Sequence, residues 1–400
     1  MANCTPISAI NVAVHPDLQL NRVCTPRSAA ARLIYHSVEV ENVKDFYTEY
    51  DTLDFSLNYE NRSMLLNSVR IEGDLRVLDS ANNLSATDDI RLDKMNGAHN
   101  FFESFTIDTQ NQGLIDSVQD YPRIVSMRRN AQYCNSDMLN SEFVCEMATG
   151  SEALSRDLLK GIVNKVSADA PLVNNDNDFS IKPHFCLNNA SGNTMLSYAK
   201  TGSIRISTHL NRNANALFGT GMTGNITYRL KNVRVVFTSV PDSGDMSPTI
   251  LRSVASLKQA VGSSFMNISS KVPAVVDAVS CSFITQANES ELMYNNNAQE
   301  RLPNITDLQF LFQDSTNSYV TYQIRDDAEI IGRYLESFGK TGYNNASLVN
   351  LKANSAYGIG LLFGSFIDLS NKKFNVQLQS GISSLNAYVI YLFFHTIKEL

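Results

Sequence analysis

Short apolar segments rich in β-branched and aromatic residues recur along the chain from Ile34 onward, and each ends at Asn, Asp, Gly or Pro. This pattern is typical of strands separated by turns. The strands it predicts before residue 244 are Leu53–Asn58, Val69–Val77, Phe101–Asp108, Phe179–Cys186, Gly202–Leu210, Ile226–Leu230 and Val233–Val240. Those it predicts after residue 244 are Ala274–Phe283, Leu308–Phe312, Tyr319–Ile324, Ile359–Asp368, Phe374–Gln379 and Ala387–Thr396. Such a series indicates an all-β fold of antiparallel sandwiches with a few inserted helices.

Helical spacing of apolar residues interrupts this series. Segments around Asp137–Met147 and Ser151–Val166 predict a helical insertion at about residues 137–166. Another helix is expected at Asp326–Phe338, and the residues on its buried side are Ile330, Ile331, Tyr334 and Leu335.

The clearest helical pattern follows Ser247 and Pro248, which suit the N-cap and the first position of a helix. The apolar residues at helical spacing after them are Ile250, Leu251, Val254, Leu257 and Val261. Gly262 would end this helix. We expect it to link two domains, with the boundary at Pro241–Gly244.

The final strand, AYVIYLFFHTI, is apolar at successive positions. Successive side chains of a strand point to opposite faces, so both faces of this strand should be covered. We therefore expect it to lie between its own sandwich and another element.

The two halves share an order of elements: a strand pair, a helix, a glycine-marked strand pair and a terminal apolar strand, VRVVFTSV or AYVIYLFF. Repetition of one sandwich explains this order. The predicted domains are an extended arm at residues 1–33, a first sandwich at 34–244, and a linker helix with a second sandwich at 245–400. The arm is either a frayed terminus or a tether to a neighbouring subunit or a particle interior.

Composition points to assembly. A chain of 400 residues exceeds the roughly 250–300 residues at which single cores stop growing. Charged residues make up 18%, below the roughly 25% typical of soluble domains, which indicates surface hidden by partners. The net charge is −7, and no dense basic stretch occurs, so direct sequence-specific nucleic-acid binding is not expected.

The cysteines have no regular spacing, which predicts reduced thiols without a disulfide framework or a zinc site; they are Cys4, Cys24, Cys134, Cys145, Cys186 and Cys281. The first residues lack a basic stretch leading into an apolar run, and no apolar run is long enough to cross a bilayer. We expect neither a signal peptide nor a transmembrane segment.

Three motifs carry possible chemistry. Gly219, Gly221 and Gly224 match a dinucleotide-binding spacing, but a strand follows them, which favours an inter-strand loop. Asp176 and Asp178 could bind a hard cation or simply form a turn.

His184 and Cys186 would alternate on one strand and could share a metal, although a half-buried pair is the simpler interpretation. His395 in the terminal strand is expected to be a core or interface histidine with its hydrogen bond satisfied. We predict no catalytic residue, no metal and no cofactor.

Five segments set the character of the chain: LDFSLNYENRSMLLNSVRIEGDLRV, FFESFTIDTQNQGLIDSVQDYPRI, GSIRISTHLNRNANALFG, YRLKNVRVVFTSV and GLLFGSFIDLSNKKFNVQLQSG. Together they resemble the double-jelly-roll major capsid proteins of polinton-like viruses, virophages, adenoviruses and tectiviruses. The resemblance implies a homotrimer that forms a pseudo-hexameric capsomer and tiles an icosahedral virion shell, with each sandwich's strands perpendicular to that shell.

The partners it implies are neighbouring capsomers, penton and minor or cement proteins, and an internal membrane reached by the N-terminal arm. The implied location is the virion, assembled inside the host cell. Two alternatives stay open at this point: a penton or receptor-binding spike, which would favour a single sandwich, and a carbohydrate-binding or carbohydrate-active β-sandwich protein.

Overall fold

The computed structural model describes residues 33–78, 90, 92–93, 95–132, 177–192, 195–219, 223–242, 248–261, 265–271, 275–302, 305–313, 318–324, 326–339, 357–370, 372–380 and 388–400. Almost all of the expected N-terminal arm lies outside these residues. The helices expected at Asp137–Met147 and Ser151–Val166 lie outside them as well.

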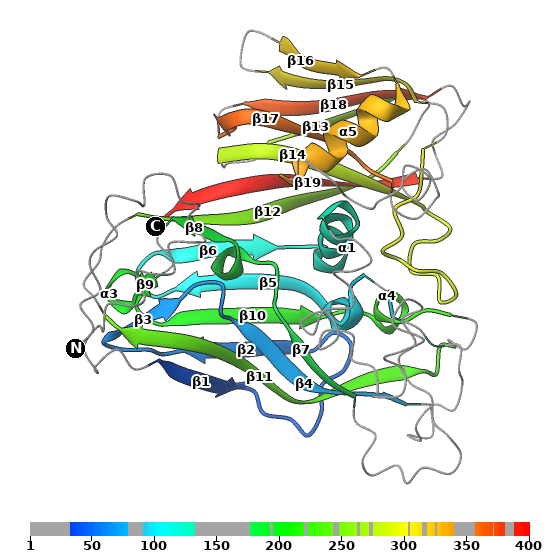
Figure 1. Cartoon of the computed structure of the whole chain (residues 1–400). Helices are drawn as coiled ribbons and strands as arrows, with labels where there is room; N and C mark the ends of the chain where they lie inside the picture. Colours follow the sequence, from blue (N-terminus) through cyan, green and yellow to red (C-terminus); the bar gives the residue numbers. More distant parts are fainter. Residues whose placement is uncertain are drawn as a thin grey trace, which may run out of the picture.

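The first sandwich packs two antiparallel sheets face to face (Figure 1). The larger sheet has the order β7 (Asn177–Ile181), β4 (Arg70–Leu78), β11 (Thr227–Pro241), β3 (Arg62–Leu65) and β9 (Met195–Ser197). β1 (Ile34–Glu39) pairs with β11 along the edge opposite β4. The smaller sheet has the order β2 (Thr52–Leu57), β10 (Ile204–Leu210), β5 (Phe102–Thr109) and β6 (Gly113–Val118).

The second sandwich repeats this plan. Its larger sheet has the order β17 (Ile359–Asp368), β14 (Val275–Thr285), β19 (Tyr388–Glu399), β12 (Thr249–Ala260) and β8 (Ala190–Gly192). Its smaller sheet has the order β13 (Phe265–Ser270), β18 (Lys373–Ser380), β15 (Ile305–Gln313) and β16 (Ser318–Ile324). The strand orders β7-β4-β11-β1 and β17-β14-β19-β12 therefore correspond, as do β2-β10-β5-β6 and β13-β18-β15-β16.

Helices complete the repeat. α1 (Tyr121–Gln132) follows β6 in the first sandwich, and α5 (Asp327–Ser337) follows β16 in the second. α5 confirms the helix expected at Asp326–Phe338, and Asp326 caps it by accepting a hydrogen bond from the Glu329 backbone amide. The other helices in the described part of the chain are short: η4 (Gly97–Phe101), η8 (Cys186–Asn188), α3 (Tyr198–Thr201) and α4 (Asn213–Ala216).

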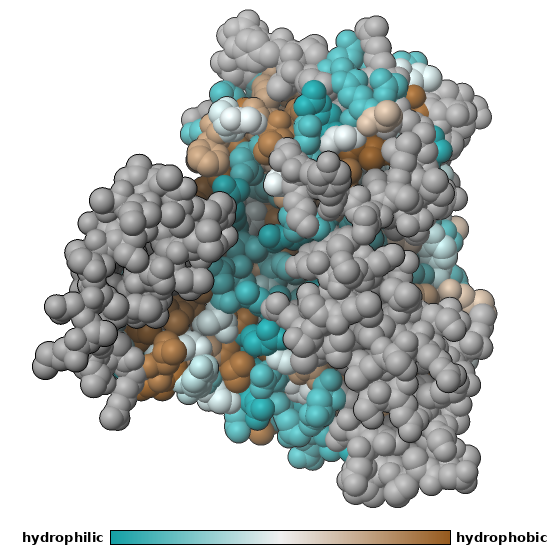
Figure 2. Space-filling view, viewed as in Figure 1, coloured by the Kyte–Doolittle hydropathy of each residue, from teal (hydrophilic) through white to brown (hydrophobic). Residues whose placement is uncertain are grey.

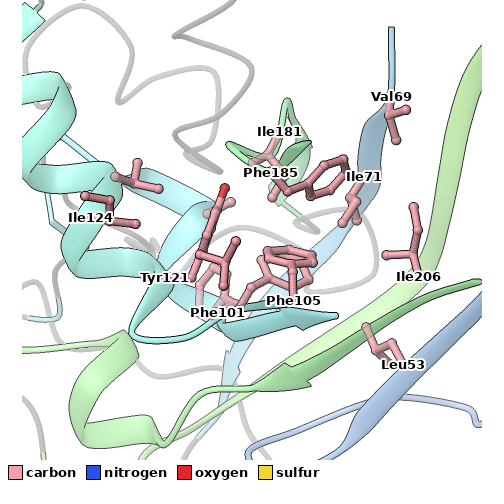
Figure 3. Close-up of a cluster of buried hydrophobic side chains, with 14 of the residues drawn as sticks. Leu53, Val69, Ile71, Phe101, Phe105, Tyr121, Ile124, Ile181, Phe185 and Ile206 are labelled. Atoms are coloured by element: carbon pink, nitrogen blue, oxygen red, sulfur yellow. The ribbon is translucent and has the colours of Figure 1, made fainter. Parts of the chain in front are cut away.

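Alternation of apolar and polar residues builds the first core. In β2, Leu53, Phe55 and Leu57 are buried while the residues between them are not. Figure 3 shows side chains from both sheets, among them Ile71 of β4 and Phe105 of β5, converging on one cluster. Burial of this apolar surface is the main force that closes each sandwich.

The helix expected after Ser247 and Pro248 is wrong, because residues Thr249–Ala260 form strand β12. β12 pairs with β19 continuously from Ile250 to Ala260. The apolar positions fit a helical period. However, this long ladder pairs the backbone N–H and C=O groups of β12 with those of β19, and this pairing overrides the local preference for a helix.

Two other expectations differ from the structure in detail. The strands expected at Ile226–Leu230 and Val233–Val240 are one strand, β11, with an irregular register around Asn232, whose φ is +50°. The strand expected at Phe179–Cys186 ends at Ile181. Pro183 follows closely and lacks the backbone N–H that a ladder requires.

Candidate functional site: the junction between the two sandwiches

β19 belongs to both hydrophobic cores. Val389, Tyr391 and Phe393 pack in the first core, whereas Ile390, Leu392 and Phe394 pack in the second. The expectation that both faces of the terminal strand are covered is therefore confirmed. One strand fixes the two sandwiches against each other, as the stacking of the two halves in Figure 1 shows.

Arg123 of α1 reaches across this junction. Its guanidinium is buried and donates hydrogen bonds to the backbone carbonyl oxygens of Ala298, at 3.1 Å, and Asn296. The same guanidinium lies 4.1 Å from the ring centroid of Tyr391. A planar cation with several donors suits this combination of carbonyl and ring contacts.

The loop between β14 and β15 carries the run Asn295, Asn296 and Asn297, and it docks onto the first sandwich. Asn297 donates to the side-chain oxygen of Asn100 at 2.9 Å. Asn296 donates to the backbone oxygen of Ala214 at 2.7 Å. From the sequence, asparagine residues predict only turns between strands. The docking role of this loop is not predicted, since only the fold shows what a loop touches.

Two carboxyl groups, of which Asp116 is buried and Asp120 half-buried, join β12 to the first sandwich. Asp116 accepts hydrogen bonds from the Ser253 hydroxyl and, at 2.7 Å, from the backbone amide of Cys186. Asp120 accepts one from the Ser256 hydroxyl at 3.1 Å. Burial raises the pKa of both carboxyl groups, and the hydrogen bonds oppose that rise.

His395 confirms the expected interface histidine. Its Nε2 lies 2.9 Å from the Ser280 hydroxyl, and its ring stacks edge-on against Phe338 of the loop after α5. Burial, with added repulsion from Arg128 and Arg252, lowers its pKa to about 3. The imidazole is therefore neutral at physiological pH and acts as a packing and hydrogen-bonding group.

His184 and Cys186 do not alternate on a strand, which corrects the expected geometry. His184 stacks on His99 with ring centroids 5.6 Å apart, and Cys186 begins η8. Burial is the main cause that lowers the pKa of His184 and raises that of the Cys186 thiol. Cys186 and Cys281 are free, buried thiols, and the other four cysteines lie outside the described residues.

The remaining motifs do not converge on a site. Gly219 and Gly224 lie in the connection before β11, and Gly221 is outside the described residues. Asp178 lies opposite Asp74 in the β4–β7 ladder, while Asp176 is outside. Among the residues that the structure describes, no group of three or more His, Cys, Asp or Glu could hold a metal ion. Within the same residues, no helix combines the length and hydrophobicity needed to span a bilayer.

A cavity of about 550 Å³ lies at the junction, and Arg128, His184, Arg252 and His395 are among its lining residues. Arg252 forms an ion pair with Asp277 at 2.6 Å. Figure 2 shows hydrophilic residues across the middle of this face, where the two sandwiches meet. The junction is thus an interface with an apolar centre, formed by β19, and a periphery of polar, hydrogen-bonded residues.

Solved structures of viral proteins have this arrangement of strands. VP54 of PBCV-1, in a structure fitted into a reconstruction of the virophage Sputnik, matches with a TM-score of 0.58 and 8% identity, over 94% of this chain and 95% of VP54. The chain is a double jelly roll.

The major capsid protein of Faustovirus matches this double jelly roll with a TM-score of 0.57 and 9% identity, over 99% of this chain and 94% of that protein. No protein-family model matches the sequence, and no curated protein sequence is similar to it. The likeness therefore lies in the fold, and the fold class expected from the sequence is confirmed.

Proposed function

We propose that this chain is a viral major capsid protein that trimerises into pseudo-hexameric capsomers and tiles an icosahedral shell. The observation that carries the proposal is the repetition, within a single chain, of the strand orders β7-β4-β11-β1 and β2-β10-β5-β6 in a second sandwich. The capsid proteins of PBCV-1 and Faustovirus share this fold along nearly their whole length, which supports the same role.

Physical reasoning favours this use of the fold. A sandwich closed by its own two sheets is a stiff block, and three chains with two blocks each fill six positions of a hexagonal array. Such tiling requires a fixed angle between the blocks. β19, shared by both cores, and the buried Arg123 contacts supply that rigidity.

The duplication also weighs against the alternatives. A penton or receptor-binding spike would favour one sandwich, whereas this chain holds two. A carbohydrate-active protein would use carboxylates in an open site. The carboxyl groups Asp116 and Asp120 instead connect the two sandwiches. We therefore propose a structural and not a catalytic role.

The finer assignments are part of the same proposal. The partners are two further copies of the chain, neighbouring capsomers, penton proteins and minor or cement proteins. Residues 1–33 are proposed to face inward, towards an internal membrane where one is present. The protein would be assembled inside the host cell and reside in the virion.

The proposal is tested by the mass of the purified chain in solution, measured by light scattering during size-exclusion chromatography over a range of concentration and ionic strength. A species of three times the chain mass of 44.4 kDa is expected. A monomer under all of these conditions would contradict the proposal.

A further inference from the structure

The cavity of about 550 Å³ at the junction has walls from both sandwiches. The first sandwich contributes Ile124 and Arg128 of α1, and the second contributes Arg252 of β12, Leu362 of β17 and His395 of β19. Its volume lies within the roughly 300–1,000 Å³ of pockets that hold small organic molecules. Tiling a shell does not require such a cavity, which makes it a candidate ligand site.

Two arginines give the lining of this cavity a positive charge. Arg128 is held by neutral amides: its Nε donates to the Gln132 side-chain oxygen at 3.0 Å, and its Nη1 donates to the Asn189 side-chain oxygen at 2.8 Å. Arg252 pairs with Asp277 at 2.6 Å. Apart from histidines, these two arginines and Asp277 are the ionisable side chains among the described lining residues, so the lining carries an excess of positive charge.

Asn189 connects the two arginines. Its side chain accepts the hydrogen bond from Arg128, and its backbone oxygen accepts one from the Arg252 backbone amide at 3.1 Å. Both arginines also lower the pKa of His395, although burial is the main cause of that shift. The two guanidinium groups therefore act on the same part of the cavity. Planar groups with several N–H donors suit the oxygens of a carboxylate or a phosphate.

His184 adds a polar group without adding charge. It is a lining residue, and its Nε2 is buried and has no hydrogen-bond partner within the described part of the chain. Burial, followed by repulsion from Arg128 and Arg129, lowers its pKa well below the usual value, so the imidazole is neutral at physiological pH. A buried nitrogen that lacks a partner is costly. An oxygen of a bound anion is one group that could supply the missing hydrogen bond.

Part of the lining is apolar. The side chains of this part are Ile124, Val254, Phe338 and Leu362. Such side chains favour the apolar body of an organic molecule, whereas a bare inorganic anion would leave them in contact with water. The lining therefore matches a molecule that has an acidic head group and an apolar body.

We propose that this cavity binds a small organic anion, whose carboxylate or phosphate head group lies between Arg128 and Arg252 and whose apolar body packs against Phe338 and Leu362. Such a ligand touches both sandwiches and stabilises their junction, since a molecule that binds only the folded chain raises its stability. The inference is independent of the proposed capsid function, because the cavity is complete within one chain.

The first test measures the binding of defined probes to the purified chain by isothermal titration calorimetry. The probe p-benzoylbenzoate carries a carboxylate on an aromatic body, decanoate carries one on a lipid-like chain, and inorganic phosphate is a head group alone. We expect p-benzoylbenzoate or decanoate to bind with a Kd below about 1 mM, and inorganic phosphate to bind at least about ten-fold more weakly. The neutral amide p-benzoylbenzamide should bind as weakly as phosphate. The tighter of the two carboxylates shows whether the site prefers a compact or a lipid-derived anion.

The second test uses variants to locate the head group. Arg128→Gln and Arg252→Gln should each weaken the binding of the tighter carboxylate at least about ten-fold, because each removes a charged donor. Arg205→Gln is the matched control: Arg205 pairs with Asp54 at 3.2 Å, is about as exposed as Arg252, and does not line the cavity. Circular dichroism and thermal unfolding show whether each variant is folded.

A further variant tests the apolar part of the lining without removing an arginine. Leu362 is 38% exposed, so Leu362→Asp should fold and place a negative charge in the cavity. It should weaken the binding of the same carboxylate at least about ten-fold. The matched control is Leu114→Asp, since Leu114 is 54% exposed on β6 and does not line the cavity. This pair decides the question if the arginine variants do not fold.

The third test locates the site directly. The wild-type chain is irradiated with p-benzoylbenzoate, digested and analysed by mass spectrometry. We expect cross-links in residues 124–132, 252–254 or 337–339, which line the cavity, and we expect excess decanoate to suppress them.

The outcomes decide the proposal. Cross-links in the cavity, together with binding that is lost in Leu362→Asp and in the folded arginine variants but kept in both controls, would support it. Failure of both organic anions to bind wild type, equal affinity in all folded variants, or cross-links only elsewhere would overturn it. None of these results bears on the mass of the assembled chain in solution, so a failure of this site is distinct from a failure of the capsid assignment.

Discussion

Tyr391 and Leu392 are neighbours in β19, yet their side chains are buried in two different hydrophobic cores. Tyr391 additionally lies beneath the Arg123 guanidinium and donates a hydrogen bond to Glu289 at 2.8 Å. Leu392 faces only the interior of its own sandwich. Because successive side chains of β19 point to opposite faces, this one strand both connects the two sandwiches and completes the core of the second.

This alternation predicts different consequences for Phe393→Ala and Phe394→Ala. Both residues are almost fully buried, so each change should cost about 3–5 kcal/mol of unfolding free energy. Phe394→Ala should destabilise the second sandwich itself. Phe393→Ala should weaken the contact between sandwiches and separate their unfolding into two transitions in differential scanning calorimetry. Identical thermograms for the two variants would contradict the assignment of the two faces.

Arg123 should be more than a packing residue. Arg123→Met retains much of the apolar stem but leaves the carbonyl oxygens of Asn296 and Ala298 without this donor. We expect a loss of about 2–4 kcal/mol in chemical denaturation, because buried unsatisfied groups are costly. Arg123→Lys keeps the charge but not the planar fork, so it should recover only part of the loss. Wild-type stability in Arg123→Met would show that these bonds contribute nothing.

Substituting alanine for either of two glycines at α5 should change the stability of the protein in opposite directions. A Cβ on Gly358 would come within 2.3 Å of the Tyr334 ring, whereas one on Gly332, inside α5, would meet nothing within 4 Å. Gly358→Ala should therefore destabilise the protein by about 1–3 kcal/mol through overpacking. Gly332→Ala should stabilise it by up to about 1 kcal/mol because alanine favours helix. Thermal unfolding measures both, and a stabilising Gly358→Ala would contradict the close packing of α5.

The pKa of His395 predicts sensitivity to acid. The neutral imidazole is favoured in the folded chain, where the pKa is about 3, against 6.5 for an unperturbed histidine. Between these values the unfolded chain binds more protons, so this group lowers the unfolding free energy as pH falls from 6.5 towards 3. The contribution of His395 to the unfolding free energy then changes by up to about 1.4 kcal/mol per pH unit.

His395→Gln keeps a polar partner for Ser280 and removes the titration. Its loss of stability between pH 7.5 and 5 should be smaller than that of wild type by about 1–2 kcal/mol. His209→Gln is the control, since His209 is exposed and its Nδ1 lies 2.9 Å from the Thr52 hydroxyl. If wild type and His395→Gln lose the same unfolding free energy between pH 7.5 and 5, His395 does not contribute to the sensitivity to acid.

Sequence alone predicts those parts of the fold whose pattern is set by burial. The continuous apolar run of β19 predicts two covered faces because the alternation of a strand leaves no other outcome. β12 is different: Ser247, Pro248 and the spacing from Ile250 satisfy the rules for a helix, and only the distant β19 makes it a strand. Pairing between residues so far apart in the chain is not contained in a local pattern.

The junction was harder to predict because it is polar. α1 buries Arg123 and Arg129, so the helix has no continuous apolar stripe and was missed. Arg129 donates to the backbone oxygen of Met95 at 2.5 Å, a partner that only the folded chain supplies. Charged residues are predicted to be exposed to solvent unless their partners are known. Here the partners come from the turn before η4 and the loop before β15.

The central claim, that the chain is a capsid building block, is tested most directly by electron microscopy of the purified protein in negative stain. We expect uniform particles with a hexagonal outline, each wide enough for six sandwiches around a three-fold axis. Fields of particles that hold only the two sandwiches of one chain, at every protein concentration and salt condition, would contradict the claim.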